Sequence, residues 1–445
     1  MTDATVTAIP SPASKPRSSL LLPDARTKKR NAAEARFRLL GAIAVCLGVL
    51  ALVGLLTSIL LNGLSAFRQA KIEVPVVLTQ VQVDEAEAAL MKTGAYRGII
   101  AGALEGALAE AGLDAAAAGV DPVDLISGEA PATLRNWVLS HPDRIGEEVQ
   151  LEILANGRID GYYKGRVTMA SAELDGNVTP EQLAFADQMK DAGLLSVGFN
   201  WGFLTLPDAS ENRPEAAGLG VAILGSAYMM LVVLGLALPI GVAASIYLEE
   251  FAPKNWITDL IEVNISNLAA VPSSVFGILG LAIFINFAGL TQSAPIVGGL
   301  ELTLMNLPTI IIATRASLKS VPPSIRDAAL GVGASKMQAV FHHVLPLAAP
   351  GILTGTIIGL AQALGETAPL LLIGMVDFVR EYPAGPPEGF FDPASALPVQ
   401  VYNWTQRADP AFVERASGAI IVLLIFLFMM NLLAIFLRRR FERRW

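Results

Sequence analysis

Long runs without a charged residue constrain this chain more than any other feature of its sequence. Residues 39–61, 218–248 and 263–300 contain no Asp, Glu, Lys or Arg. About 20 predominantly apolar residues in a helix are enough to cross the hydrocarbon core of a bilayer. With 53% hydrophobic and only 16% charged residues, the chain is predicted to be a membrane protein, since soluble domains contain about 25% charged residues.

The apolar stretches predict six membrane spans. They lie at residues 39–61, 218–248, about 270–287, about 295–317, about 350–375 and about 417–437. An amphipathic helix is expected over residues 258–267. Basic clusters flank the first and the last span, and cytoplasmic flanks are enriched in Lys and Arg. We therefore expect a multi-pass protein of a bacterial inner (cytoplasmic) membrane with both termini in the cytoplasm: residues 1–38 as a mobile tail and residues 438–445 as a basic tail.

Residues 68–217, between the first two spans, are long enough for a domain with its own core. They carry 11 Lys and Arg against 23 Asp and Glu, a net charge of −12. The composition of residues 84–112 predicts a helix, and Thr179 to Gln182 form a capping box that predicts the start of another. Two alternating runs around Ala155-Asn156-Gly157 predict a β-hairpin. We expect an extracytoplasmic mixed α/β domain inserted into an all-α polytopic membrane protein.

Residues 320–346, between spans four and five, are too polar to cross a bilayer. Gly331 and Gly333 allow a sharp turn, and Ser335 can cap a helix that follows it. That helix has an apolar face at helical spacing, formed by Met337, Val340, Phe341 and Val344. Such a face can lie in a groove of a soluble partner; an ordinary interhelical loop is the alternative.

This loop resembles the EAA loop of permease subunits from ATP-driven importers. The family pattern is E-A-A, three residues, G, nine residues, I, one residue and L-P. The chain has Asp327-Ala328-Ala329, Gly333 and Leu345-Pro346 at that spacing. Asp327 keeps the carboxylate of the usual Glu, whereas His343 replaces an apolar residue. Residues 365–371, GETAPLL, resemble the narrower PstA-type permease of phosphate importers. The likeness runs from about residue 218 to the C-terminus, with residues 39–61 as a matching first span.

The resemblance implies a type I ABC importer permease fold with six transmembrane helices, five of them in a core over residues 218–437. It implies that the cytoplasmic loop couples the chain to a separate ATPase, through Asp327, Ala328, Ala329, Gly333, Phe341, Leu345 and Pro346. The implied partners are a homologous second permease subunit, an ATPase dimer that uses ATP and Mg²⁺, and an extracytoplasmic phosphate-binding protein, with no nucleic acid.

No Gly-Lys pair occurs anywhere in the chain. A nucleotide-binding loop of the G-x-x-x-x-G-K-[ST] type, which cradles phosphates, is therefore missing from the sequence. We expect the chain to bind neither ATP nor any other cofactor by itself. The sequence also contains no catalytic set and no metal-ligand cluster, which argues against an enzyme.

Three ionisable residues lie at membrane depth: Glu301, Arg315 and Glu366. A charge at the bilayer centre costs roughly 2.5 to 3.5 kcal/mol on insertion scales. We expect Glu301 at the interface and Glu366 buried inside span five, while Arg315 faces either a polar path or the headgroups. An anion path needs guanidinium, hydroxyl or amide donors. The candidates for the substrate path are therefore Arg315, Gln362, Thr367, Ser273 and Ser274, with Glu366 pairing with a cation.

The sequence thus favours the permease subunit of an inorganic phosphate importer, forming half of the translocation path. PstA-like relatives imply an arginine one turn before the GETAPLL motif, where this chain has Gln362. A permease for another oxyanion, such as sulfate or molybdate, is the alternative within the class. A membrane-anchored sensor, with residues 68–217 as the receptor, is the alternative outside it. Because residues 70–215 fall outside the resemblance, we expect transport not to depend on their chemistry.

Overall fold

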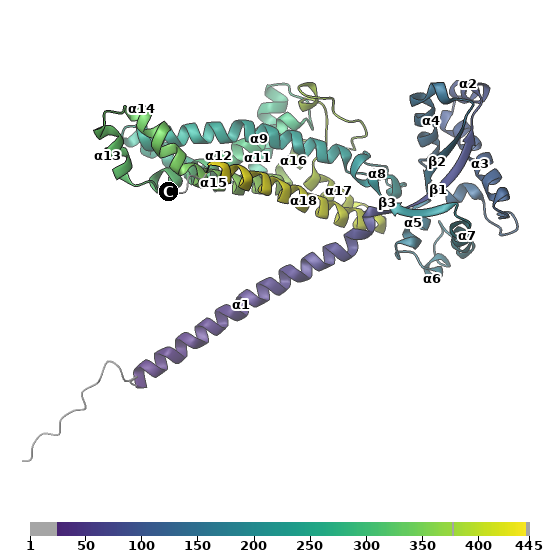
Figure 1. The fold of residues 1–445 in the computed structure, drawn as a ribbon, viewed down its shortest axis with the longest axis horizontal. Helices are drawn as coiled ribbons and strands as arrows, with labels where there is room; N and C mark the ends of the chain where they lie inside the picture. The colour runs from purple at the N-terminus through teal and green to yellow at the C-terminus, as the bar shows by residue number, and fades with distance from the viewer. Residues whose placement is uncertain (1–24, 376–377, 442–445) are drawn as a thin grey trace, which may run out of the picture. The chain divides into compact units, whose positions relative to one another are not determined.

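The computed structural model of the protein describes residues 25–375 and 378–441. It divides into two compact units, Met1–Ser58 and Ile59–Trp445. The described part of the first unit belongs to one helix, α1 (Ala25–Gly63), which contains the predicted first span (Figure 1). The side chains of residues 26–58 are all exposed. An apolar helix of this kind requires lipid or another helix as its surroundings.

Helix α1 begins earlier than the predicted span. The prediction of a mobile tail is wrong for residues 25–38, which form the first turns of α1. This stretch is rich in Ala, Arg and Lys, which favour helix, and Arg38 Nη2 lies 2.8 Å from Glu34 Oε1 one turn away. Residues 1–24 of the predicted tail lie outside the described residues.

The insert, residues 68–217, is built around a three-stranded antiparallel sheet. Its strands are β1 (Arg68–Val77), β2 (Glu148–Leu154) and β3 (Leu195–Phe199), in the order β2-β1-β3. Ile72 of β1 pairs with Ile153 on one side and with Leu195 on the other. Alternate β1 side chains are buried, as expected for a strand with one covered face.

Seven α-helices surround the sheet of the insert: α2 (Gln80–Ala88), α3 (Lys92–Glu110), α4 (Ala130–Ser140), α5 (Gly157–Tyr163), α6 (Met169–Ala172), α7 (Pro180–Asp191) and α8 (Trp201–Thr205). The capping box of Thr179 and Gln182 is confirmed at the start of α7. Tyr96, Ile100 and Leu104 of α3 are fully buried in the insert's own core. The mixed α/β domain is therefore confirmed.

The predicted hairpin around Ala155-Asn156-Gly157 is wrong. β2 pairs with β1, and residue 157 begins helix α5. The Asn156 side chain accepts a hydrogen bond of 2.9 Å from the backbone N–H of Arg158 and so caps this helix. An Asn-Gly pair signals either a hairpin turn or a helix start, and here the cap prevails.

Among the described residues, the membrane part contains helices and connecting loops but no strand. Its elements are α9 (Gly220–Ile246), the π-helical turn η5 (Tyr247–Phe251), α10 (Trp256–Leu268), α11 (Ser273–Gly280) with a π-helical extension (Leu281–Phe287), α12 (Pro295–Lys319), α13 (Pro323–Gly331), α14 (Lys336–Ala339) with a π-helical turn (Val340–Val344), α15 (Leu345–Gly365), α16 (Ala368–Leu372), α17 (Leu397–Gln406) and α18 (Pro410–Phe441).

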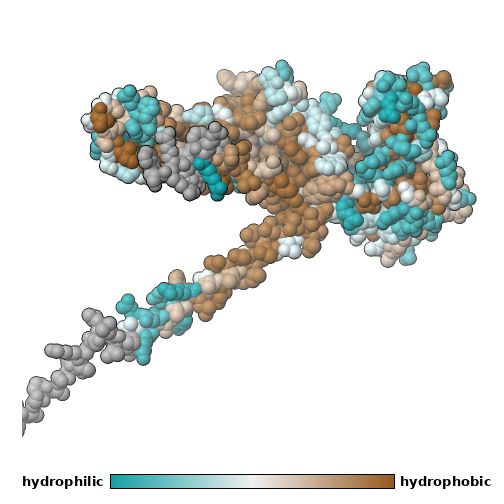
Figure 2. All heavy atoms as spheres, in the orientation of Figure 1, coloured by the Kyte–Doolittle hydropathy of each residue, from teal (hydrophilic) through white to brown (hydrophobic). Residues whose placement is uncertain are grey.

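Five helices of the described residues are long and apolar enough to cross a membrane. Helices α10 and α11, bent by 100° at their junction, make a sixth span if the pair counts as one. Hydrophobic residues gather over the spanning helices, whereas hydrophilic residues dominate the insert (Figure 2). The prediction of an all-α polytopic core with an inserted α/β domain is confirmed.

Span five is interrupted, contrary to the prediction of one helix over residues 350–375. Helix α15 ends at Gly365, and α16 begins at Ala368 with Pro369 in its first turn. Proline fits there because the first helical N–H groups have no partner within the helix. Glu366 follows the end of α15 and is only half-buried. The prediction that Glu366 is buried within a helix is wrong.

Glu301 is also placed differently from the prediction of an interfacial residue. It is 1% exposed in α12, and among the described residues neither carboxylate oxygen has a hydrogen-bond partner. Gly280 of α11 provides the space, since a Cβ added there would lie 3.3 Å from Glu301 Oε2. Close helix packing at a glycine has therefore enclosed this carboxyl group.

A buried ionic cluster joins the insert to the start of α18. Lys164 Nζ lies 2.6 Å from Asp160 Oδ2 and 3.1 Å from Glu414 Oε1 of α18. Arg166 pairs with the other oxygen of Glu414, and Asp160 accepts a 2.9 Å hydrogen bond from the backbone N–H of Ala70 in β1. Burial lowers the pKa of Lys164, against the opposing effect of Asp160. The insert and the last span therefore share one charge network.

Arg415, the next residue of α18, extends this cluster. Its guanidinium donates to the carbonyl oxygens of Ala217 (3.0 Å) and Glu215 (2.8 Å) and to Gln69 Oε1 (3.1 Å). It also lies 5.4 Å from the centre of the Phe203 ring. Burial raises the pKa of the Glu215 carboxyl group. Arg415 thus contacts both ends of the insert, where it leaves the first span and where it enters the second, whereas Glu414 contacts Lys164 and Arg166 in its middle.

The ionic cluster predicts that Lys164 is required for the stability of the joint. Replacing Lys164 with Met leaves Asp160 and Glu414 buried beside one cation fewer, and we expect a loss of about 3 kcal/mol in the free energy of unfolding. Arg97→Met is the matched control, because Arg97 is exposed on α3 of the same domain. Chemical denaturation of the detergent-solubilised protein measures both; equal stabilities of the two variants would contradict the role of Lys164.

Candidate functional site

The loop between α12 and α15 forms a compact helix–turn–helix. Helix α13 ends at Gly331, and Gly333 has a φ of +91°, a left-handed conformation that glycine adopts at little cost. Ser335 caps α14 through a capping box with Gln338, with hydrogen bonds of 3.2 and 2.9 Å. The predicted turn and the predicted cap are both confirmed.

The apolar residues of this loop face in two directions. Val340 and Val344 are buried with Ile246 and Leu318 in a small hydrophobic cluster that anchors the loop to α9 and α12. The residues that remain exposed are Leu330, Val332, Met337 and Phe341. Val332 is 87% exposed, so its apolar side chain makes little contact with the rest of the loop. The predicted apolar face is therefore divided between an anchor and a free surface.

We call the exposed part the α13–α14 surface; it consists of Asp327, Ala328, Leu330, Val332, Met337 and Phe341. Exposed apolar side chains beside a carboxylate are typical of a protein-binding patch. Of the other residues predicted for coupling, Ala329 is buried, and Leu345 and Pro346 are half-buried at the start of α15. Their positions suit support of the surface from below, and only the exposed residues are accessible to another protein.

The residues predicted for a substrate path are only partly brought together. Ser273 and Ser274 begin α11, which packs closely on α16 because Gly277 lacks a side chain: a Cβ added there would lie 2.9 Å from Pro369 Cα. Thr367 directly precedes α16. The two serines and Thr367 therefore lie at the starts of neighbouring helices, while Gln362 is exposed on α15.

Arg315 is placed apart from these residues, in an ionic network. Its Nη2 lies 2.6 Å from Glu262 Oε1 of α10, and its Nε lies 3.4 Å from Glu249 Oε2 in the turn after α9. A guanidinium shared by two carboxylates is neutralised. The predicted sites did not include Glu249 and its neighbours, whose sequence signal was a pair of glutamates directly after an uncharged run.

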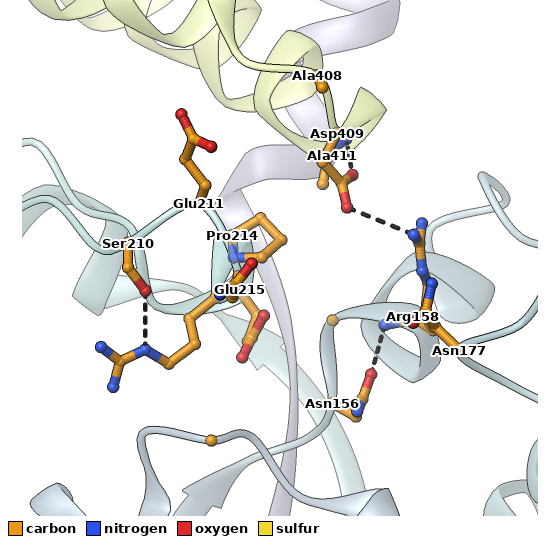
Figure 3. Close-up of a pocket in the computed structure, with 14 residues that line it drawn as sticks. Asn156, Arg158, Asn177, Ser210, Glu211, Pro214, Glu215, Ala408, Asp409 and Ala411 are labelled. Atoms are coloured by element: carbon orange, nitrogen blue, oxygen red, sulfur yellow. Dashed lines mark hydrogen bonds and ion pairs between the residues drawn. The ribbon is translucent and has the colours of Figure 1, made fainter.

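A polar groove of about 790 Å³ lies between the insert and the segment that leads into α18. Arg158 faces Asp409 across it at 3.5 Å (Figure 3) and also pairs with Asp175 at 3.3 Å. Arg213, a second cation of the groove, pairs with Glu129. Each arginine is matched by a carboxylate, so the groove does not attract anions.

Comparison with known proteins shows where the chain belongs. Residues 237–445 match a family described as the binding-protein-dependent transport system inner membrane component, and residues 24–173 match a domain of unknown function, DUF3333. The probable ABC transporter permease protein YqgI of Bacillus subtilis is 34% identical over 236 residues, which cover 51% of this chain and 80% of that protein. The chain belongs to this family of inner-membrane permeases.

Within the family, the permease is similar to PstA proteins. The phosphate transport system permease protein PstA 1 of Mycobacterium tuberculosis is 30% identical over 230 residues, covering 52% of this permease and 73% of that protein. An inward-facing structure of the MetNI methionine ABC transporter has a TM-score of 0.40 and 16% sequence identity, over 50% of this permease and 97% of that chain. The similarity to the PstA proteins makes the permease a PstA-type member.

Proposed function

We propose that this chain is the transmembrane permease subunit of an ATP-driven importer of inorganic phosphate. The observation that carries the proposal is its similarity, over about half of its length, to proteins named phosphate transport system permease. The family match over residues 237–445 includes the α13–α14 surface and the GETAPLL motif at the break between α15 and α16. Hydroxyl and amide donors on α11 and α15 and directly before α16 supply the anion path: Ser273, Ser274, Gln362 and Thr367, with Glu366 pairing with a cation.

In this proposal the chain crosses a bacterial inner membrane with both termini and the α13–α14 surface in the cytoplasm. The basic residues that flank the first and last spans support that orientation. The insert then lies on the outer side. The paired arginines of its groove give no route for gathering anions, which supports delivery of the solute by a separate extracytoplasmic binding protein.

The remaining partners follow from what one chain lacks. A homologous second permease subunit would supply the other half of the path. The sequence lacks a phosphate-cradling loop of its own, so a separate ATPase dimer binds and hydrolyses Mg²⁺-ATP. Exposed apolar residues of the α13–α14 surface, together with Asp327, suit a groove on that ATPase.

Uptake of radioactive phosphate tests the proposed substrate. Cells that produce this chain with its neighbouring transport genes should accumulate phosphate, and unlabelled sulfate or molybdate in tenfold excess should not compete. If either anion competes, the substrate of the importer is another oxyanion and the assignment of phosphate is wrong. No ATP-dependent uptake of any of the three, from a complex shown to be assembled, would favour the sensor.

Gly333 tests whether the loop contacts the ATPase. Gly333→Trp places a bulky side chain at a left-handed position beside the exposed surface, and we expect at least a tenfold loss of ATPase in a pull-down, with normal membrane insertion. Gly331→Ala is the control, because Gly331 ends α13 with open space around it. Full ATPase recovery and uptake with Gly333→Trp would exclude the loop as the coupling element.

A further inference from the structure

The turn after α9 contacts three different elements through three consecutive residues. Glu249 lies 3.4 Å from Arg315 and 3.5 Å from Lys319, both on α12. Glu250 binds Arg326 of α13. The ring of Phe251 lies beneath Lys336 of α14, 5.2 Å from its Nζ. The turn is a π-helix, a form that occurs frequently at functional sites.

The contact between Glu250 and Arg326 is the most extensive of the three. Arg326 donates to Glu250 Oε1 from Nε at 3.0 Å and from Nη2 at 2.7 Å. The same guanidinium donates to the carbonyl oxygens of Val321 (2.8 Å) and Leu318 (2.9 Å) at the end of α12. The Glu250 side chain is only 7% exposed. Arg326 therefore connects the ends of α9 and α12 to α13 through one rigid planar group.

Arg326 directly precedes Asp327, the first residue of the loop pattern. Its guanidinium is directed into the protein, whereas Asp327 is exposed on the α13–α14 surface. The two residues are adjacent on one short helix, α13 (Pro323–Gly331). Any rotation of α13 under a docked partner must therefore move the Arg326 guanidinium against Glu250 or carry the end of α9 with it.

We propose that the ion pair of Glu250 and Arg326 is the positioning contact through which movement of the α13–α14 surface reaches α9 and α12. The inference rests on the proposed function and names the residues that perform its coupling step. The pair acts through α13 and contacts neither ATP nor solute. Glu249 and Phe251 support the same turn through their weaker contacts with α12 and α14.

The test uses the complete complex, with the second permease, the ATPase and the solute-loaded binding protein, in proteoliposomes. Glu250→Gln removes the charge at nearly constant shape. We expect normal assembly and basal ATP hydrolysis, but at least a tenfold smaller stimulation of hydrolysis by the loaded binding protein, and a matching loss of uptake. Arg326→Lys keeps the charge but loses the planar guanidinium that donates two hydrogen bonds to Glu250, and it should give an intermediate stimulation. Asp259→Asn, at an exposed carboxylate of α10, should behave as wild type.

Three outcomes would decide against the proposal. Wild-type stimulation and uptake with Glu250→Gln would show that the pair transmits nothing. Loss of assembly in both Glu250→Gln and Arg326→Lys would show a folding contact only. A wild-type complex that assembles but shows no stimulated hydrolysis would overturn the proposed function and this inference with it, whereas a defect confined to the variants supports both.

Discussion

Burying a charged side chain costs free energy unless an opposite charge pairs with it, and pairs of this kind organise both ends of the spanning core. At the insert, Lys164 and Arg415 lie among carboxylates and carbonyl oxygens. At the loop, Arg326 and Arg315 are held by Glu250 and Glu262. Buried pairs add little net stability, because desolvation offsets attraction, but losing one partner is costly. Such pairs therefore determine which helix ends meet, while apolar packing supplies the stability between them.

Because of its ionic cluster, the insert cannot be deleted without affecting the last span. Sequence similarity places residues 70–215 outside the part shared with known permeases, which predicted that transport does not depend on them. The structure, however, gives Glu414 and Arg415 of the last span their main partners in and beside the insert. A deletion would leave these α18 charges without Lys164, Arg166 and Asp160. The insert is therefore part of the support of α18 as well as a separate domain.

Features set by local chemistry were predictable from sequence. The apolar runs of the sequence predict the spans. Residue type and spacing predict the turn at Gly333 and the caps at Ser335 and Thr179. Two of the predictions that failed concern features that depend on distant neighbours. Glu301 is enclosed because Gly280 of another helix leaves room, and β2 pairs with a strand about 75 residues earlier instead of forming a hairpin. The pairs of Glu250 and of Arg315 likewise join residues more than 50 positions apart, so no local pattern announces them.

The central claim is that one chain links an insert on the outer side to a coupling surface on the cytoplasmic side. Cysteine labelling with a membrane-impermeant reagent, in a Cys46→Ser background, tests it most directly. Leu174, 91% exposed in the insert, and Val332, 87% exposed beside Gly333, are suitable positions. In intact spheroplasts we predict labelling of Leu174→Cys alone, and labelling of Val332→Cys only after the membrane is opened. Labelling of Val332→Cys but not of Leu174→Cys in intact spheroplasts would contradict the account.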